Sequence, residues 1–298
     1  MTSSLVPRDL KVTWQSAVSD YLDLTKPRIT LMVLVTTALG FLTAGGEAGL
    51  TTLAFVLGGV GFLSSGASAL NHVWERETDA LMKRTADRPL PAGRLESMNA
   101  LVFGVALSLA GLGLLVVGAN LLTTLLGALA LATYVFVYTP LKKITSLATL
   151  VGAIPGALPP VMGWTAAEGS LGMGAWVLFG ILFLWQLPHT LAIAWLYRED
   201  YARAGFPMLP VIDPDGRSTA RQAVLYGTAL VPVSLLPTLA GLSGAPYLVG
   251  ALALSMAFLG SCISFSMSAS NRTARRLLVV SLLYLPAILA TMVLDRLV

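Results

Sequence analysis

Three residues with side-chain oxygens, Asn71, Glu75 and Asp79, stand four positions apart in the stretch NHVWERETDALMKRTADRPLPAGR (71–94). On a helix each residue turns by about 100°, so Glu75 would lie about 40° and Asp79 about 80° from Asn71. All three would then share one face. Two carboxylates and an amide oxygen are ligands that suit Mg²⁺, which also keeps waters and binds substrate phosphates. The spacing therefore predicts a magnesium site.

The alternative is a solvated helix end whose acids pair with nearby cations such as Arg76, Lys83 and Arg84. The three residues directly follow a long apolar segment, and polar groups beside a membrane span usually face a cavity or the interior of a helix bundle. Without a cation between them, two like charges on one ridge would also repel each other. We therefore favour the metal-site interpretation.

A second acidic cluster lies in AWLYREDYARAGFPMLPVIDPDG (194–216), again directly after an apolar segment. Its charged residues are Glu199, Asp200, Arg203, Asp213 and Asp215. Alone, this cluster is a weak signal. Together with the first cluster, it predicts that two segments form opposite walls of one metal site.

Basic residues near the two clusters could bind an anion such as a diphosphate, which stays negative even when a metal ion is bound. The candidates are Arg28, Arg84, Arg88, Arg94, Lys142 and Lys143. Arg can contact two phosphate oxygens at once, and Lys acts as a point charge. Each could equally serve membrane orientation or bind lipid headgroups. As a group they exceed what orientation requires, which favours anion binding.

The two histidines differ in their surroundings. His189 lies inside an apolar segment, FLWQLPHTLAIAW, where a polar residue is a functional candidate and an interhelical hydrogen bond is the alternative. His72 adjoins Asn71 but would point about 100° away from it, so we interpret it as an interface residue. The sequence contains no glycine loop for phosphates, no Cys/His zinc spacing and no G-x-S-x-G elbow. Hydride, hydrolase and nucleotide-driven chemistry are therefore unsupported.

Membrane-spanning helices must position these residues. The 298 residues are 56% hydrophobic and 11% charged, with a mean hydropathy of +0.78, which is typical of an integral membrane protein. Nine apolar runs are each close to the roughly 20 residues that cross a bilayer. They cover 29–46, 52–72, 98–118, 121–138, 145–164, 173–196, 219–241, 246–268 and 274–294. Alternating polarity is absent, so the predicted fold class is an all-α membrane protein.

Proline and glycine cluster in the fifth run. Its prolines, Pro155, Pro159 and Pro160, predict a kinked or broken helix. Its glycines could equally serve close helix packing; they are Gly152, Gly156 and Gly163.

The basic residues are distributed unevenly between the connectors. Apart from Arg296, every Lys and Arg precedes the first run or follows the second, fourth, sixth or eighth. Because cytoplasmic connectors are rich in Lys and Arg, we expect a plasma (inner) membrane protein with a cytoplasmic N-terminus and cytoplasmic active-site loops. The C-terminus would lie outside.

We divide the chain into a cytoplasmic segment, 1–28, and a single nine-helix transmembrane domain, 29–298. Within the first, LKVTWQSAVSDYLDL (10–24) carries apolar residues on one helical face, which predicts a helix along the membrane surface. The acidic clusters follow the second and sixth runs. This predicts two similar four-helix halves plus a ninth helix around a central cavity, with the site between the halves.

The stretch 71–94 resembles the first Asp-rich motif of the UbiA superfamily of intramembrane prenyltransferases, N-x-x-x-D/E-x-x-x-D. LTKPRI, YTPLKK and FLWQLPHTLAIAWLYREDYARAGFPMLPV resemble the protoheme IX farnesyltransferase (heme O synthase) branch. With the nine-helix plan, this resemblance covers nearly the whole chain. Two positions depart from the superfamily pattern. Glu75 replaces a common Asp, and Ala204 stands where the second motif, D-x-x-x-D, has an Asp four residues after Asp200.

The resemblance implies transfer of a farnesyl group from farnesyl diphosphate to a vinyl group of heme b, with addition of water, giving heme O and diphosphate. Mg²⁺ would be held by Asn71, Glu75, Asp79 and Asp200. The substrates would be bound by Arg28, Arg84, Arg88, Arg94, Lys142, Lys143, Glu199, Tyr201, Arg203 and His189, with His189 against the porphyrin as a hypothesis. The implied partners are the lipid bilayer and, as candidates, a heme A synthase or terminal oxidase assembly factors, but no nucleic acid.

Two alternatives stay open at this point. A prenyltransferase of the same fold could act on a small aromatic acceptor such as a hydroxybenzoate, although residues 183–211 argue against it. A transporter could use the same helices to enclose an anion. The acidic ridge disfavours a transporter, because an anion carrier would not place carboxylates in its binding site.

Overall fold

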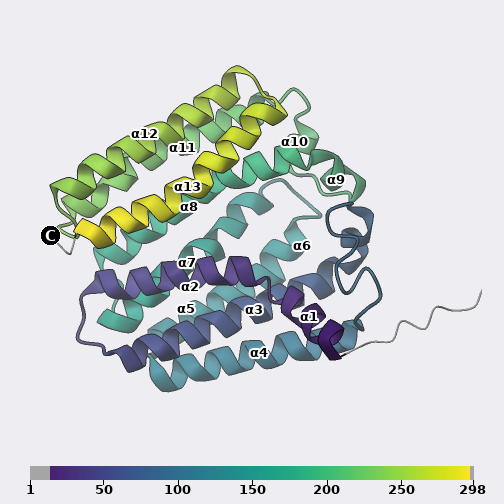
Figure 1. Cartoon of the computed structure of the whole chain (residues 1–298), viewed down its shortest axis with the longest axis horizontal. Coiled ribbons are helices and arrows are strands. Elements are labelled where there is room, and N and C mark those ends of the chain that lie inside the picture. Colours follow the sequence, from purple (N-terminus) through teal and green to yellow (C-terminus); the bar gives the residue numbers. More distant parts are fainter. Residues whose placement is uncertain (1–13, 296–298) are drawn as a thin grey trace, which may run out of the picture.

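The computed structural model describes residues 14–295, with side chains from residue 17 onward, and this part of the chain is helical without strands (Figure 1). Nine helical segments within it are long and apolar enough to cross a membrane, as predicted. They are α2 (Pro27–Ala44), α3 (Leu50–Leu81), α4 (Ser97–Gly118), Leu121–Leu141, α7 (Ala148–Glu168), α8 (Met173–Leu196), α11 (Arg217–Leu239), α12 (Ala245–Met267) and α13 (Asn271–Asp295). The segment Leu121–Leu141 combines α5 (Leu121–Ala132), the π-helical η1 (Thr133–Tyr138) and α6 (Thr139–Leu141).

Three short helices lie between or before these spans. They are α1 (Trp14–Leu24), α9 (Arg198–Arg203) and α10 (Leu209–Ile212). The helix that we predicted over 10–24 is α1 for its described part, and residues 10–13 lie outside the described residues. Its position along the membrane surface stays a prediction. In α1, Val18 and Leu22 are more than half exposed, whereas Leu24 is fully buried.

Helix α3 is much longer than the apolar run that predicted it. It has 32 residues and therefore a length of about 48 Å, against about 30 Å for a hydrocarbon core. Its last turns continue past Asp79, which confirms the expectation that Asn71, Glu75 and Asp79 lie on one helix. The extra length carries these residues to the cytoplasmic end expected from the charge distribution.

Helix α7 is continuous through its three prolines, so of the predicted kink or break the break is excluded and the kink stays a prediction. Pro155, Pro159 and Pro160 are all buried. Glycine provides close packing instead: a Cβ at Gly163 would overlap the carbonyl oxygen of Thr37, and a Cβ at Gly156 would overlap the Gln186 side chain. The α7 backbone can therefore lie directly against α2 and α8.

The helices form two neighbouring groups (Figure 1). Helices α11, α12 and α13 pack together and against α8, around a core that includes Phe258, Cys262 and Tyr284. Helices α3 and α4 pack along each other on the opposite side, while α2 and α7 pack together between the groups. The proposed similarity of two four-helix halves stays a prediction.

Candidate active site

The predicted ridge on α3 is buried. Asn71 is 1%, Glu75 4% and Asp79 1% exposed, which rules out the alternative of a solvated helix end. Arg76, one of the cations of that alternative, pairs with exposed Glu77 and Ser97. Arg76 is therefore not the partner of Glu75 or Asp79.

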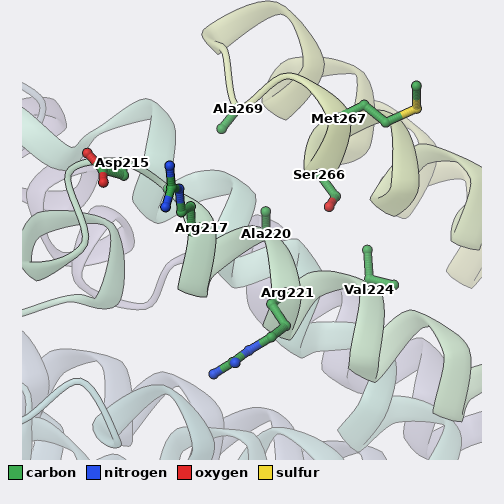
Figure 2. A pocket seen from close by; sticks show the side chains of 9 residues that line it. Asp215, Arg217, Ala220, Arg221, Val224, Ser266, Met267 and Ala269 are labelled. Carbon is green, nitrogen blue, oxygen red and sulfur yellow. The ribbon is translucent and has the colours of Figure 1, made fainter.

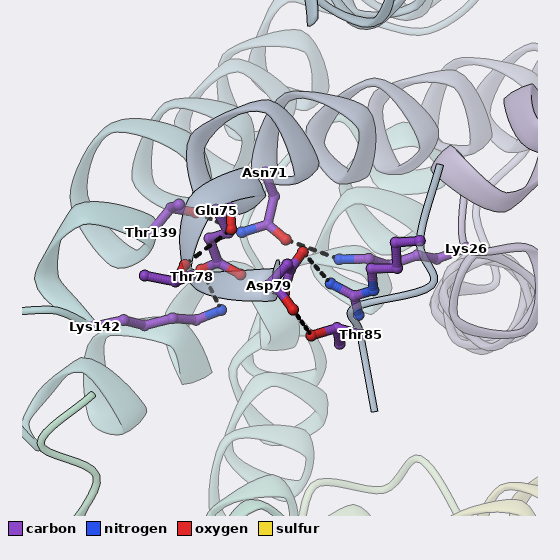
Figure 3. A network of polar contacts seen from close by, with 9 residues as sticks. Lys26, Asn71, Glu75, Thr78, Asp79, Thr85, Thr139 and Lys142 are labelled. Carbon is purple, nitrogen blue, oxygen red and sulfur yellow. Dashed lines mark hydrogen bonds and ion pairs between the residues drawn. The ribbon is translucent and has the colours of Figure 1, made fainter. Parts of the chain in front are cut away.

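Each oxygen-bearing side chain of the ridge is bonded to one cation (Figure 3). The Lys26 amine donates to Asn71 Oδ1 at 2.9 Å. The Lys142 amine lies 2.8 Å from Glu75 Oε1, and Arg88 Nη1 lies 2.7 Å from Asp79 Oδ2. We call these six residues the charged cluster. Its cations come from three separate segments, and Lys26 and Lys142 approach α3 from opposite sides (Figure 3).

Lys26 belongs to the charged cluster and was not predicted from the sequence. With a φ of 47°, it is the one non-glycine residue of the described chain in the left-handed region. That conformation costs roughly 1–2 kcal/mol in an L-residue. Pro27, at the start of α2, fixes its own φ and disfavours right-handed helix in the residue before it. In this strained backbone conformation, the Lys26 amine reaches Asn71.

The two lysines of the charged cluster titrate differently. Burial, together with the nearby Arg88 and Lys142, lowers the pKa of Lys26 to about 7. Burial would also lower the pKa of Lys142, but Tyr138, Glu75 and Tyr134 outweigh it and raise that pKa above its usual value. Lys142 is thus a fixed charge, whereas Lys26 changes its charge near neutral pH.

Neighbouring hydroxyl groups fix the ridge in place. Asn71 Nδ2 donates to Thr139 Oγ1 at 3.2 Å, and Thr139 donates to the Tyr134 carbonyl oxygen. Thr85 Oγ1 donates to the Asp79 carbonyl oxygen at 2.9 Å. The hydrogen bond from Thr139, in α6, to Tyr134 reaches η1, and π-helical turns are frequent at functional sites.

The second acidic cluster lies beside the C-terminal end of α3. Asp200 is buried and pairs with Arg203, whose Nε also points at the Leu81 carbonyl oxygen. Arg84 lies over the Tyr197 ring, 4.9 Å from its centroid. A small apolar core joins the same two segments through Met82, Ala194, Ala204, Phe206 and Met208. The two predicted walls are therefore adjacent in the fold.

The remaining predicted site residues make no side-chain hydrogen bond or ion pair with the charged cluster within the described chain. Arg28, Lys143 and Glu199 are exposed and make no ion pair within the described chain. Tyr201 packs edge-on against Phe206. Arg94 binds Asp20 of α1 and Asp87, and the hydrogen bond to Asp20 helps to raise the pKa of Arg94. Arg94 thereby ties α1 to the loop that carries Arg88.

The donor set fits Mg²⁺ with few protein ligands. Asp79 Oδ1 is buried and has no hydrogen-bond partner within the described chain. Among the described residues, no three Asp, Glu, His or Cys side chains are close enough to share a metal ion. A site of two carboxylates and one amide matches Mg²⁺, whose remaining ligands are commonly waters and substrate phosphates. Asn71, Glu75 and Asp79 would hold the ion.

The two histidines have different surroundings in the structure. His72 is 2% exposed, and neither ring nitrogen has a partner within the described chain. Its interpretation as an interface residue stays a prediction. On α3 it lies about 20° from Asp79, seven residues away. His189 lies on α8 against Ser281 of α13.

A hollow of about 450 Å³ lies elsewhere, between the N-terminal end of α11 and the C-terminal end of α12 (Figure 2). It is lined by residues that include Asp215, Arg217, Arg221 and Ser266. None of the charged cluster contributes to it. Asp213, another acid of the second cluster, instead caps α11 by accepting from the backbone and hydroxyl of Thr219.

Comparison with known proteins agrees with this geometry. Residues 32–287 match the model of the UbiA prenyltransferase family, and the chain belongs to this family. Proteins named protoheme IX farnesyltransferase are similar over nearly their whole length. That of Solibacter usitatus is 53% identical, covering 93% of this chain and 98% of the relative. That of Salinibacter ruber is 47% identical, with coverage of 93% and 98%.

Solved structures share the fold at low sequence identity. A digeranylgeranylglyceryl phosphate synthase has a TM-score of 0.79 at 18% identity, covering 93% of this chain and 98% of that one. A UbiA homolog from Archaeoglobus fulgidus, bound to DMAPP and Mg²⁺, has a TM-score of 0.68 at 18% identity, with coverage of 92% and 99%. The chain is thus a multi-pass membrane enzyme that transfers prenyl groups.

Proposed function

We propose that this enzyme transfers the farnesyl group of farnesyl diphosphate to a vinyl group of heme b, adds water and releases heme O and diphosphate. The observation that carries prenyl transfer is the charged cluster, in which three half-buried cations meet a buried ridge of oxygen-bearing side chains. The choice of heme b rests on the names of the curated relatives.

The cations of the cluster would bind the diphosphate. Lys26, Arg88 and Lys142 already point into one buried region, so they need little reorganisation to exchange carboxylate and amide oxygens for phosphate oxygens. Preorganised charges in a water-poor site stabilise a leaving group more strongly than the same charges in water. When bound, Mg²⁺ would neutralise part of the charge that develops on the diphosphate. Asn71, Glu75 and Asp79 would hold it, with Asp200 as a neighbouring acid.

The reaction breaks the C1–O bond, the π bond of the vinyl group and one O–H bond of water, and it forms one C–C, one C–O and one O–H bond. The C1–O bond of farnesyl diphosphate breaks, and its electron pair stays with the diphosphate. C1 then bonds to the terminal carbon of the vinyl group, and a water oxygen bonds to the inner vinyl carbon. The proton lost by that water goes to the released diphosphate. The allylic cation would be protected from early capture by water because the spans below the cluster are apolar.

The test is a product assay with the purified full-length enzyme. Heme b, farnesyl diphosphate and Mg²⁺ are incubated with it, and heme O is detected by mass. Asp79→Asn and Glu75→Gln should each lower turnover by about 100-fold or more, since each removes a group that acts on the developing charge. Arg76→Gln is the matched control on the exposed face of α3 and should keep wild-type turnover.

The acceptor assignment is tested in the same assay. Replacing heme b with a hydroxybenzoate should give no prenylated product. If the enzyme prenylates hydroxybenzoate and gives no product from heme b, the assignment of heme b as the acceptor is wrong. Full activity of both Asp79→Asn and Glu75→Gln would contradict the metal assignment.

The proposed setting is the plasma membrane. The charge distribution places the N-terminus and the charged cluster on the cytoplasmic side and the C-terminus outside. Each proposed substrate has a large apolar part, the farnesyl chain or the porphyrin. Both substrates can therefore dissolve in the bilayer and reach the enzyme from the side. A heme A synthase or a terminal oxidase assembly factor is the kind of partner that would receive the product.

A further inference from the structure

His189 contacts Ser281 of α13 and Trp185 of its own helix, and Trp185 is itself hydrogen-bonded to Ser281. Its Nδ1 lies 2.7 Å from Ser281 Oγ. The Trp185 ring stacks on its imidazole with 5.0 Å between centroids and 22° between planes. Trp185 Nε1 in turn donates to the Ser281 carbonyl oxygen at 2.8 Å. The imidazole is therefore fixed both in its plane and along its edge.

The hydrogen bonds of Ser281 decide which nitrogen of His189 carries the proton. Ser281 Oγ lies 2.7 Å from the carbonyl oxygen of Leu278, which can only accept. The single hydroxyl hydrogen of Ser281 goes to that carbonyl, so Ser281 Oγ must accept from His189 Nδ1–H. In the neutral imidazole, Nε2 then carries a free lone pair. Within the described chain, no residue bonds this atom.

The His189 residue is also partly exposed within the membrane-spanning helix α8. His189 and Trp185 are partly exposed, although α8 packs against α7, α11 and α13. His189 lies seven residues before the end of α8, which places it about 10 Å below that end. At this depth, water is scarce and a ligand would be largely apolar. A free lone pair here suits a ligand that combines an apolar body with an electron-pair acceptor.

A heme has these two properties. Histidines that ligate metals nearly always donate their other ring N–H to a neighbouring oxygen, which fixes the tautomer and the ring orientation. Iron in heme is commonly bound by such a histidine. Ser281 supplies the neighbouring oxygen here, and Trp185 supplies a flat apolar wall.

His72 has no neighbouring group that fixes its tautomer or ring orientation within the described chain. It is the only other histidine in the chain. Its ring nitrogens have no partner within the described chain, and Lys26, Arg88 and Lys142 all act on it electrostatically. His72 therefore lies near the charged cluster on α3, apart from the α8–α13 side that holds His189.

We infer that His189 Nε2 coordinates the iron of the heme acceptor, with Ser281 and Trp185 as positioning residues. This inference rests on the proposed function, because it takes heme b as the acceptor. It assigns the porphyrin to the α8–α13 side of the molecule. The farnesyl diphosphate occupies the α3 side, so the two substrates approach each other from opposite walls.

The test is spectroscopic and uses no farnesyl diphosphate. Ferric heme b is titrated into the detergent-solubilised full chain, and its absorption and electron paramagnetic resonance spectra are recorded. Wild type should show imidazole ligation. His189→Gly should lose it, and free imidazole should restore it to that variant. His72→Gln is the matched control, since it removes the only other imidazole, and it should keep both the wild-type spectrum and affinity.

Ser281→Ala tests the orientation and does not depend on the folding of a His189 variant. It should weaken heme binding by about 10- to 100-fold, the usual effect of losing the group that orients a ligating histidine. Unchanged spectra in His189→Gly, loss of ligation in His72→Gln, or failure of imidazole to restore the spectrum would each overturn the inference.

The outcome is separable from that of the proposed function. If wild type makes heme O while His189→Gly keeps the wild-type heme spectrum, only the ligation is wrong. If wild type ligates heme through His189 but makes no heme O, the ligation stands and the proposed function is wrong.

Discussion

Replacing Lys142 with Met should destabilise the protein far more than any neighbouring surface substitution. Its amine lies 2.8 Å from Glu75 Oε1, and the two side chains are only 16% and 6% exposed. At that distance and an effective dielectric constant of about 20, the gross attraction is roughly 6 kcal/mol. Desolvation of the two charges offsets much of this attraction. The net effect of removing Lys142 is nevertheless large, because Glu75 would be left as a buried, unpaired charge.

We expect Lys142→Met to lower the free energy of unfolding by about 3–5 kcal/mol. The double variant Glu75→Gln/Lys142→Met removes both charges and should cost about 1 kcal/mol or less, since apolar or neutral replacements of a buried pair are often tolerated. Lys143→Met is the control, one residue along and exposed, and should stay within about 0.5 kcal/mol of wild type.

The measurement is reversible unfolding in mixed detergent micelles, followed by tryptophan fluorescence. The double-mutant cycle isolates the interaction between Glu75 and Lys142. If Lys142→Met proves no more destabilising than the double variant, the two residues do not form a buried pair that matters for stability. The account of the charged cluster would then be wrong.

Three further predictions concern other parts of the fold. Gly163→Ala should cost about 1–3 kcal/mol by forcing α7 away from Thr37, whereas Gly113→Ala, where a Cβ meets no atom within 4 Å, should be neutral or stabilising in the same unfolding assay. Asp295→Ala should cost about 1 kcal/mol, because the Asp295 carboxylate accepts from backbone N–H groups at the start of α12; a change near zero would contradict this capping role. Because the Lys26 amine loses its charge as pH rises through about 7, the KM for farnesyl diphosphate should increase between about pH 6 and pH 8 in wild type. It should stay flat in Lys26→Arg, whose guanidinium remains charged, and parallel profiles would exclude Lys26 as the cause.

The fold could be predicted from the sequence because its main determinants are local. Apolar length predicts each span, and the alternation of Lys and Arg between connectors supports the number of spans. The ridge of Asn71, Glu75 and Asp79 was predictable for a similar reason: a helix turns by a fixed angle per residue, so spacing alone determines the shared face. The end of α3 was less predictable, since hydropathy falls at residue 72 while the helix continues to Leu81.

The partners of the ridge depend on non-local geometry. Lys142 and Lys143 are adjacent and chemically identical, yet Lys142 binds Glu75 and Lys143 is exposed. The preceding π-helical turn, η1, shifts the register of the helix that leads to them, and nothing in the sequence marks such a turn. Lys26 was missed because a left-handed backbone at a lysine has no sequence signal. Arg88 and Arg94 lie in one loop, and only the fold shows that the first reaches Asp79 and the second Asp20.

The makeup of the charged cluster has a consequence for the order in which ligands can arrive. With Lys26, Arg88 and Lys142 all protonated, three positive charges face two negative ones, from Glu75 and Asp79. A bare divalent ion entering this region would add to an existing surplus of positive charge, and a metal-free diphosphate would meet carboxylates that repel it. A diphosphate that already carries its ion, still anionic overall, would bring the region close to electroneutrality. Charge balance within the charged cluster therefore favours binding of an ion and a diphosphate together over binding of either alone.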